Sequence, residues 1–229
     1  MENYEKETIA AIATALSDSG IGIVRISGEN AIYIVDSIFR SASGKKILTK
    51  VQSHMIHYGY IVDKDENIID EVMTSVMKAP KSYTMEDTVE INCHGGVLVM
   101  QKVLETVLQA GARLAEPGEF TKRAFLNGRI DLSRAEAVID VIHSQNEYAL
   151  SSSVSQLKGR LSDKIRSLRE DILYQIAFIE SALDDPEHIS LEGYPEQLAE
   201  KVTGFEKEIQ KLLATADNGR LMKEGISTV

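Results

Sequence analysis

The sequence predicts an α+β fold in two parts, a mixed α/β sheet domain followed by an incomplete bundle of long helices. Two observations support this prediction. From residue 1 to about 128, strand-like and helix-like patterns alternate, which is typical of a sheet with helices packed on it. After Gly128 the pattern changes, because residues 131–184 contain no proline and one glycine and repeat apolar side chains at the helical period.

The first half is expected to form short strands separated by two helices. The polar stretch DKDEN lies between two strand-like runs, which predicts a hairpin. Gly111 suits the C-cap of the second helix. The expected elements are strands at 8–15 and 20–28, a helix at 29–40, strands at 53–63, 68–80 and 88–93, and a helix at 95–112.

The second half is expected to be helical. Ser133 and Glu136 form an S-x-x-E capping box at the start of an apolar-periodic run that continues to residue 183. One helix of that length would extend roughly 75 Å, so we expect either a break near LSSSV (150–154) or a helix that needs partners. Pro195 suits position N1 of a last helix. Bundles usually close with about four helices, so we expect another chain or further sequence to complete this one.

Composition and charge narrow the class of protein. The chain has 229 residues, 43% of them hydrophobic, and a net charge of −10, which argues against strong nonspecific binding to nucleic acid. Its single cysteine excludes an internal disulfide framework and leaves a structural zinc site without its usual thiolates. The polar N-terminus does not resemble a signal peptide, and no apolar run is long enough to span a membrane. A cytoplasmic protein without membrane association is therefore expected.

The stretch VEINCHGG concentrates reactive residue types, with Cys93 beside His94 and two glycines after them. Neighbouring side chains on a strand point to opposite faces, so Cys93 and His94 are not expected to ligate one metal or to act as a pair. We expect no metal site and no catalytic residue, and a buried apolar role for Cys93. Gly95 and Gly96 suit either an anion site at the helix start or a tight turn with close packing.

Glu90 and Arg25 are the candidate recognition residues. Glu90 lies in an otherwise apolar strand, where its carboxylate suits either a solvated face or two parallel N–H donors such as those of an amino-pyrimidine ring. Arg25 lies in the apolar stretch GIVRISG, and its guanidinium suits a carboxylate, which could be that of Glu90 itself. The polar junction 116–138 is either a site or a set of caps and salt bridges.

Three stretches carry a resemblance to a known family. GIGIVRISG, SYTMEDTVEINCHGG and EPGEFTKRAFLNGRIDLSRAEAVIDVI resemble, in order and spacing, the N-terminal part of the bacterial tRNA modification GTPases of the MnmE (TrmE) family. The closing GRLMKEGISTV resembles the segment that leads into the GTPase domain of that family. The resemblance covers residues 5 to 229.

This resemblance implies a fold and a domain order. Residues 1–118 would form a folate-binding and dimerisation domain similar to part of the glycine-cleavage T-protein. Residues 119–218 would form the first half of a helical domain, and 219–229 would lead into the G domain. No G-x-x-x-x-G-K-[ST] loop is present in the chain. We therefore expect this chain alone to bind no GTP and to modify no tRNA.

The resemblance also implies an activity for the family. Its members hydrolyse GTP with Mg²⁺ and K⁺ and act as homodimers. With the FAD- and NADH-dependent partner MnmG, they install an aminomethyl-type group at C5 of the wobble uridine (U34) of certain tRNAs. The one-carbon unit comes from a tetrahydrofolate derivative, either 5-formyl- or methylene-tetrahydrofolate.

By position, the implied folate contacts are Arg25, Glu90 and Arg129, with Glu90 reading the ring N–H and amino group of the pterin. Arg129 stands where many family members have lysine, and Met85 where glycine is usual. Two other functions stay open. One is a stand-alone folate-dependent one-carbon transferase that uses His94 or Asp87 as its acid or base. The other is a dimerisation module without a ligand.

Overall fold

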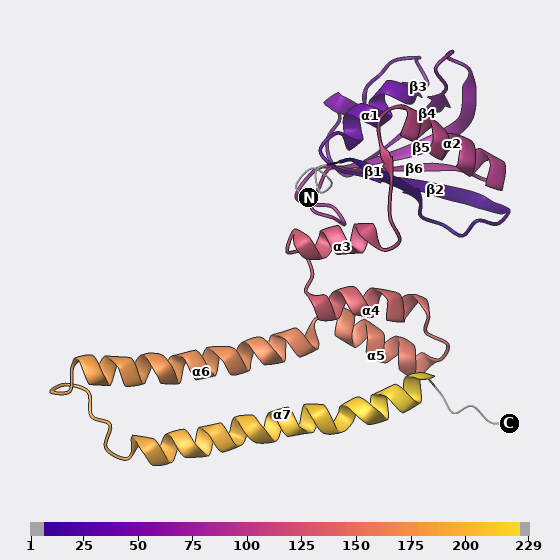
Figure 1. Cartoon of the computed structure of the whole chain (residues 1–229). Helices are drawn as coiled ribbons and strands as arrows, with labels where there is room; N and C mark the ends of the chain where they lie inside the picture. Colours follow the sequence, from indigo (N-terminus) through magenta and orange to yellow (C-terminus); the bar gives the residue numbers. More distant parts are fainter. Residues whose placement is uncertain (1–6, 225–229) are drawn as a thin grey trace, which may run out of the picture. The chain divides into compact units, whose positions relative to one another are not determined.

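A computed structural model describes the backbone of residues 7–224 and the side chains of residues 7–214. The chain forms two compact units, Met1–Ile130 and Asp131–Val229. The first unit contains a sheet with helices and the second contains helices alone (Figure 1). This confirms the predicted α+β fold, with a sheet domain followed by a helical domain.

A seven-stranded sheet organises the first unit, with strand order β3-β4-β5-β6-β2-β1-β7. All neighbours are antiparallel except β1 and β7, which are parallel. Its elements are β1 (Ile9–Ile12), β2 (Ser19–Ser27), α1 (Ala31–Ile38), β3 (Phe39–Ser41), the 3₁₀ helix η2 (Leu48–Lys50), β4 (Met55–Val62), β5 (Ile68–Met77), β6 (Thr88–Gly95), α2 (Val97–Gln109), β7 (Arg113–Leu114) and α3 (Glu119–Leu126).

The expected hairpin is confirmed as β4 and β5. Its turn is held by Asp63, whose Oδ1 accepts the backbone N–H groups of Asp65 and Asn67 at 2.9 and 2.8 Å. The helix expected at 29–40 ends earlier, at Ile38. Phe39 is extended and pairs with Ile61 of β4, because its fully buried ring belongs to the core under that strand.

The core lies on one face of the sheet, under α1 and α2. Val24 and Ile26 of β2 and Val89 and Ile91 of β6 alternate toward it and are fully buried. The intervening side chains point to the opposite face, which we call the open face. Arg25 of β2 and Glu90 of β6 project from it.

Four large apolar side chains are exposed on the open face or at its edge. They are Ile21, Ile56, Tyr58 and Met73.

The second unit consists of α4 (Leu132–Ile142), α5 (Glu147–Leu157), α6 (Arg160–Asp184) and α7 (Tyr194–Glu224). The expected long helix is therefore divided, and the stretch 150–154 lies inside α5 instead of breaking it. The breaks fall at Asn146, whose side chain caps α5 by accepting from the Ala149 N–H, and at Gly159, whose φ is +83°. A left-handed glycine and an N-capping asparagine both favour a new helix start.

The cap predicted at Ser133 is wrong by two residues. Asp131 caps α4, and its Oδ1 accepts the Arg134 N–H at 3.0 Å. Ser133 instead donates its hydroxyl to Asp131 at 2.7 Å. Burial raises the pKa of Asp131, but hydrogen bonds from Ser162, Ser133 and the Arg134 N–H outweigh it and lower the pKa to about 2.

Helices α6 and α7 run side by side in opposite directions (Figure 1). The ion pair of Lys164 with Glu208 joins them at 2.8 Å, and the Tyr194 hydroxyl donates to the Gln175 carbonyl at 3.3 Å. Many apolar side chains of the pair stay exposed, among them Ile165, Ile172, Leu173, Ile176, Leu183, Val202, Ile209 and Leu213. This agrees with the expected incomplete bundle. Pro195 lies in the first turn of α7, one residue inside its start.

Two further expectations concern boundaries and membranes. The sequence placed a boundary between residues 118 and 119, whereas the first compact unit continues to Ile130. The difference arises because α3 is tied to the sheet domain, for example by the Asn127 side chain, which donates to the Thr84 carbonyl at 2.7 Å. Across residues 7–224, no helix has both the length and the apolar character required to cross a membrane.

Candidate functional site

Arg25 and Glu90 face each other directly across β2 and β6. The Nε and Nη2 atoms of Arg25 each lie 2.8 Å from Oε1 of Glu90. Both side chains are half-buried, with 28% and 22% of their surfaces exposed. The pair is therefore sheltered enough to hold a defined geometry and open enough for a ligand to reach it.

Tyr83 joins this pair to the third predicted residue, Arg129. The Arg25 Cζ lies 5.2 Å from the centre of the Tyr83 ring and the Arg129 Cζ lies 4.8 Å from it, which is cation–π distance. Arg129 Nη1 also donates to the Tyr83 carbonyl at 3.2 Å. The structure thus brings Arg25, Glu90 and Arg129 together around one aromatic ring.

Helix α3 supplies two more contacts to the same place. The Arg25 Cζ lies 5.7 Å from the centre of the Phe120 ring, and the Tyr83 and Thr121 hydroxyls are hydrogen-bonded at 2.9 Å. Sequence reasoning missed Tyr83 and Phe120, although both lie inside motifs that it singled out, SYTMED and GEFTKR. The sequence signal that could have found them was an aromatic side chain in the same motif as a candidate charged residue.

The loop between β5 and β6 presents Tyr83 by burying its neighbour Thr84. Thr84 is fully buried, and its hydroxyl lies 2.6 Å from that of Ser27. Met85 follows with a φ of +62°, a left-handed conformation that is uncommon without glycine. The turn at Met85 lets Glu86 come back under the loop, where its Oε2 accepts the Ser27 hydroxyl at 2.7 Å.

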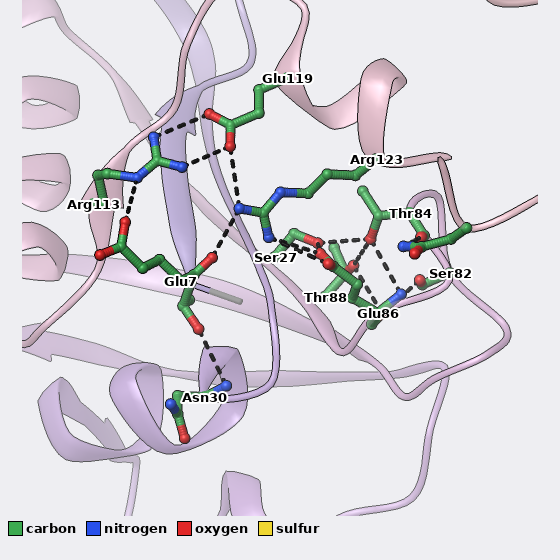
Figure 2. A network of polar contacts seen from close by, with 12 residues as sticks. Glu7, Ser27, Asn30, Ser82, Thr84, Glu86, Thr88, Arg113, Glu119 and Arg123 are labelled. Carbon is green, nitrogen blue, oxygen red and sulfur yellow. Dashed lines mark hydrogen bonds and ion pairs between the residues drawn. The ribbon is translucent and has the colours of Figure 1, made fainter. Parts of the chain in front are cut away.

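A network of buried charges holds α3 against the sheet (Figure 2). Arg123 contacts Glu119 at 3.1 Å and Glu86 at 3.2 Å, and it also donates to the Glu7 carbonyl at 2.8 Å. Arg113 contacts the same oxygen of Glu119, Oε1, at 2.7 Å, and its Nη1 donates to Oε2 at 3.1 Å. Only 6% of the Arg123 side chain and 8% of the Glu119 side chain are exposed.

The network fixes the charge of Glu119. Burial raises its pKa, but hydrogen bonds from Arg113, the Glu116 backbone N–H and Arg123 outweigh burial and lower the pKa to about 2. Within the polar junction 116–138, the contacts of Glu119 and Arg123 are thus structural salt bridges of the first unit. They belong to α3, which the sequence did not predict as a helix.

Cys93 and His94 separate as strand geometry requires. Cys93 is buried, its thiol donates to the Gly22 carbonyl at 3.4 Å, and burial with the nearby Asp70 charge raises its pKa to about 11. His94 is exposed and its Nδ1 lies 2.7 Å from Asp70, and this hydrogen bond raises the histidine pKa. Among the described residues, no three His, Cys, Asp or Glu side chains are placed to hold a metal ion.

The two glycines after His94 have different roles. A Cβ on Gly95 would lie 2.4 Å from the Ser19 carbonyl oxygen, so close strand packing requires glycine there. Gly96 is the N-cap residue of α2, and a Cβ there would meet nothing closer than 3.7 Å. Packing thus accounts for Gly95, whereas it does not require glycine at position 96.

Comparison with known proteins finds two family models that follow each other along the chain. The model described as "GTP-binding protein TrmE N-terminus" matches residues 8–129, and the model described as "MnmE helical domain" matches residues 132–227. Their junction agrees with the division between the two compact units at residues 130 and 131.

Individual relatives carry one name, tRNA modification GTPase MnmE. The protein of Lachnoclostridium phytofermentans is 61% identical over 223 residues, covering 97% of this chain and 48% of the relative. Those of Bacillus subtilis and Geobacillus kaustophilus are 51% and 53% identical, covering 97% and 98% of this chain and 49% of each relative. The chain spans about half the length of the curated relatives it matches.

Proposed function

Because this chain belongs to the MnmE family of tRNA modification GTPases, we propose that its first unit binds a reduced folate for that modification. The ligand is a tetrahydrofolate derivative, 5-formyl- or methylene-tetrahydrofolate. The observation that supports this most is the gathering of Arg25, Glu90 and Arg129 around Tyr83. These residues come from separate segments and supply a carboxylate, two cations and an aromatic ring.

The chemistry of these groups matches that of a folate. A carboxylate can accept two parallel N–H donors, which the amino-pyrimidine edge of a pterin supplies. Both Arg25 contacts go to Oε1 of Glu90, so neither of them occupies Oε2. The guanidinium groups of Arg25 and Arg129 suit the anionic glutamate tail, and Tyr83 and Phe120 suit the flat ring.

The open face supports a homodimer. Ile56, Tyr58 and Met73 on neighbouring strands expose large apolar side chains, as does Ile21 near the start of β2. Exposed apolar side chains grouped on one face often mark a protein–protein interface. Arg25 and Glu90 project from the same face, so a second copy bound there would lie close to the folate site.

The remaining proposals concern the whole protein of which this chain is a part. We infer that it hydrolyses GTP with Mg²⁺ and K⁺ and, with MnmG, modifies C5 of the wobble uridine of certain tRNAs in the cytoplasm. Further sequence would then cover the exposed apolar side chains of α6 and α7. This assignment rests on the family and on the incomplete bundle of the second unit.

A stand-alone one-carbon transferase is less favoured by the geometry. His94 lies four residues beyond Glu90 on β6, which is about 13 Å at the usual rise of a strand. Asp87 accepts the Ala79 backbone N–H at 2.8 Å and so serves the loop. Neither candidate acid or base lies beside the Arg25–Glu90 pair.

Titration of 5-formyl-tetrahydrofolate by calorimetry tests the folate proposal. We expect the chain to bind it and Glu90→Ala to weaken binding by about 100-fold, or about 2.7 kcal/mol. Glu66→Ala is the matched control, because Glu66 also pairs with an arginine but lies in the hairpin turn and is exposed. Failure of the unsubstituted chain to bind would leave only the ligand-free dimerisation module. Binding with turnover of an amine would support the transferase instead.

A further inference from the structure

Helix α3 is held in place by charges, although it carries side chains of the candidate site. Its buried residues are Glu119, Arg123 and Ala124, so Ala124 is the one apolar side chain among them, while Phe120 is half-buried. An eight-residue helix gains little stability from its own backbone. The ion pairs made by Glu119 and Arg123 are therefore expected to contribute strongly to its position.

The same ion pairs reach the loop that carries Tyr83. Arg123 contacts Glu86 at 3.2 Å, and Glu86 is held in turn by the Ser27 hydroxyl. Asn127, directly after α3, donates to the Thr84 carbonyl at 2.7 Å. Glu86 and Thr84 lie in the loop that presents Tyr83, so these contacts hold the loop and α3 together.

Other side chains of the same helix and loop belong to the candidate site. Phe120 from α3 and Tyr83 from the loop both lie within cation–π distance of Arg25, and Thr121 holds the Tyr83 hydroxyl. Displacement of α3 would move Phe120 and Thr121 together, and the hydrogen bond between Thr121 and Tyr83 would carry that movement to the loop. Small displacements of the residues that support a site are known to weaken it strongly.

We propose that Glu86 and Arg123 are positioning residues, which act through α3 and the Tyr83 loop to set the geometry around Arg25 and Glu90. They do not touch the ligand themselves. The effect on folate binding rests on the proposed function, whereas the effect on the position of α3 does not. The two parts of the proposal therefore need separate measurements.

The chain contains no tryptophan, so Phe120→Trp introduces a single reporter on α3. In that background, Glu86→Gln keeps the shape of residue 86 and removes the charge that Arg123 contacts. We expect acrylamide quenching of Trp fluorescence without ligand to rise at least about twofold as α3 loosens. Binding of 5-formyl-tetrahydrofolate is measured with Phe120 in place, because Phe120 belongs to the candidate site. It should weaken about tenfold in Glu86→Gln. Arg123→Lys, which keeps the charge but loses the forked contact, should act in the same direction.

Glu105→Gln is the matched control, because it removes a carboxylate from the exposed Lys102 pair on α2. It should change neither quenching nor binding. Unchanged quenching in both Glu86→Gln and Arg123→Lys would overturn the proposal, and so would looser α3 with undiminished folate binding. If the unsubstituted chain binds no folate, the proposed function fails. The quenching result alone then decides whether Glu86 and Arg123 position α3.

Discussion

Arg25 and Glu90 are direct partners across two antiparallel strands, although 65 residues separate them in the sequence. Their pair is half-buried, and its cation also lies near the Tyr83 and Phe120 rings. Removal of either partner would thus leave the charge of the other half-buried without its ion-pair partner. The pair has a structural role in the free protein and a proposed recognition role when folate binds.

The structural part of that role can be measured by a double-mutant cycle. We expect the free energies of unfolding of Arg25→Met, Glu90→Gln and the double variant to give a coupling energy of about 1 kcal/mol. Urea unfolding followed by circular dichroism is the measurement. A coupling energy near zero would mean that the pair does not stabilise the sheet and that its geometry serves the ligand alone.

Association through the open face predicts sensitivity to charge at Ile56. Its side chain is 64% exposed on that face, and Ile56→Glu should weaken dimerisation at least about 100-fold by placing a charge in an apolar interface. Analytical ultracentrifugation over a concentration series measures this. Leu98→Glu is the control, because Leu98 is 69% exposed on α2, which packs on the other face. Equal effects of the two substitutions would contradict the assignment of the interface.

The buried charge network predicts a loss of stability in acid. The pKa of Glu119 is lowered from its ordinary value of 4.5 to about 2. Its contribution is therefore complete above the ordinary value and is lost as pH falls through the folded value. We expect about 2 kcal/mol of this contribution to disappear between about pH 6 and pH 3. Across that range, the urea midpoint should fall less steeply with decreasing pH for Glu119→Gln than for the unsubstituted chain. Parallel profiles of midpoint against pH for the two proteins would refute the prediction.

Cys93 should be unreactive in the folded chain. It is buried, and its pKa is raised to about 11, so roughly one molecule in a thousand carries a thiolate at pH 8. Labelling with a disulfide reagent should be at least about 100-fold slower than in guanidinium chloride, where the thiol is exposed. Cys93→Ala should leave folate binding unchanged. Fast labelling of the folded chain would reopen a catalytic role.

The N-cap residue of α4 is Asp131 in the structure, whereas the sequence predicted Ser133. Asp131→Ala should lower stability by about 1–2 kcal/mol, because it removes the cap and the Ser162 contact at 2.7 Å that joins α4 to α6. Ser133→Ala should cost much less, since Ser133 only donates to Asp131. Thermal unfolding of the two variants compares them. A larger loss for Ser133→Ala would restore the predicted capping box.

Alternation of apolar residues was enough to predict the strands that carry Arg25 and Glu90. It also predicted that Cys93 and His94 would separate, because a strand has only two faces. The breaks between the helices were harder to predict from the sequence, since Asn146 and Gly159 are weak local signals inside a long apolar period. Helix α3 was missed because its buried face is charged, with Glu119 and Arg123 where an apolar stripe would be expected.

The sequence by itself determined the two-part fold, the faces of the strands and the family, since these depend on local periodicity and on contiguous motifs. Tertiary structure decided which distant groups meet. Tyr83 lies beside Arg25 and Arg129, and Arg123 between Glu86 and Glu119, only because strand register and the loop at Met85 bring these segments together. A buried charge is stable only with its partners in place, and the sequence of one segment does not specify partners that another supplies.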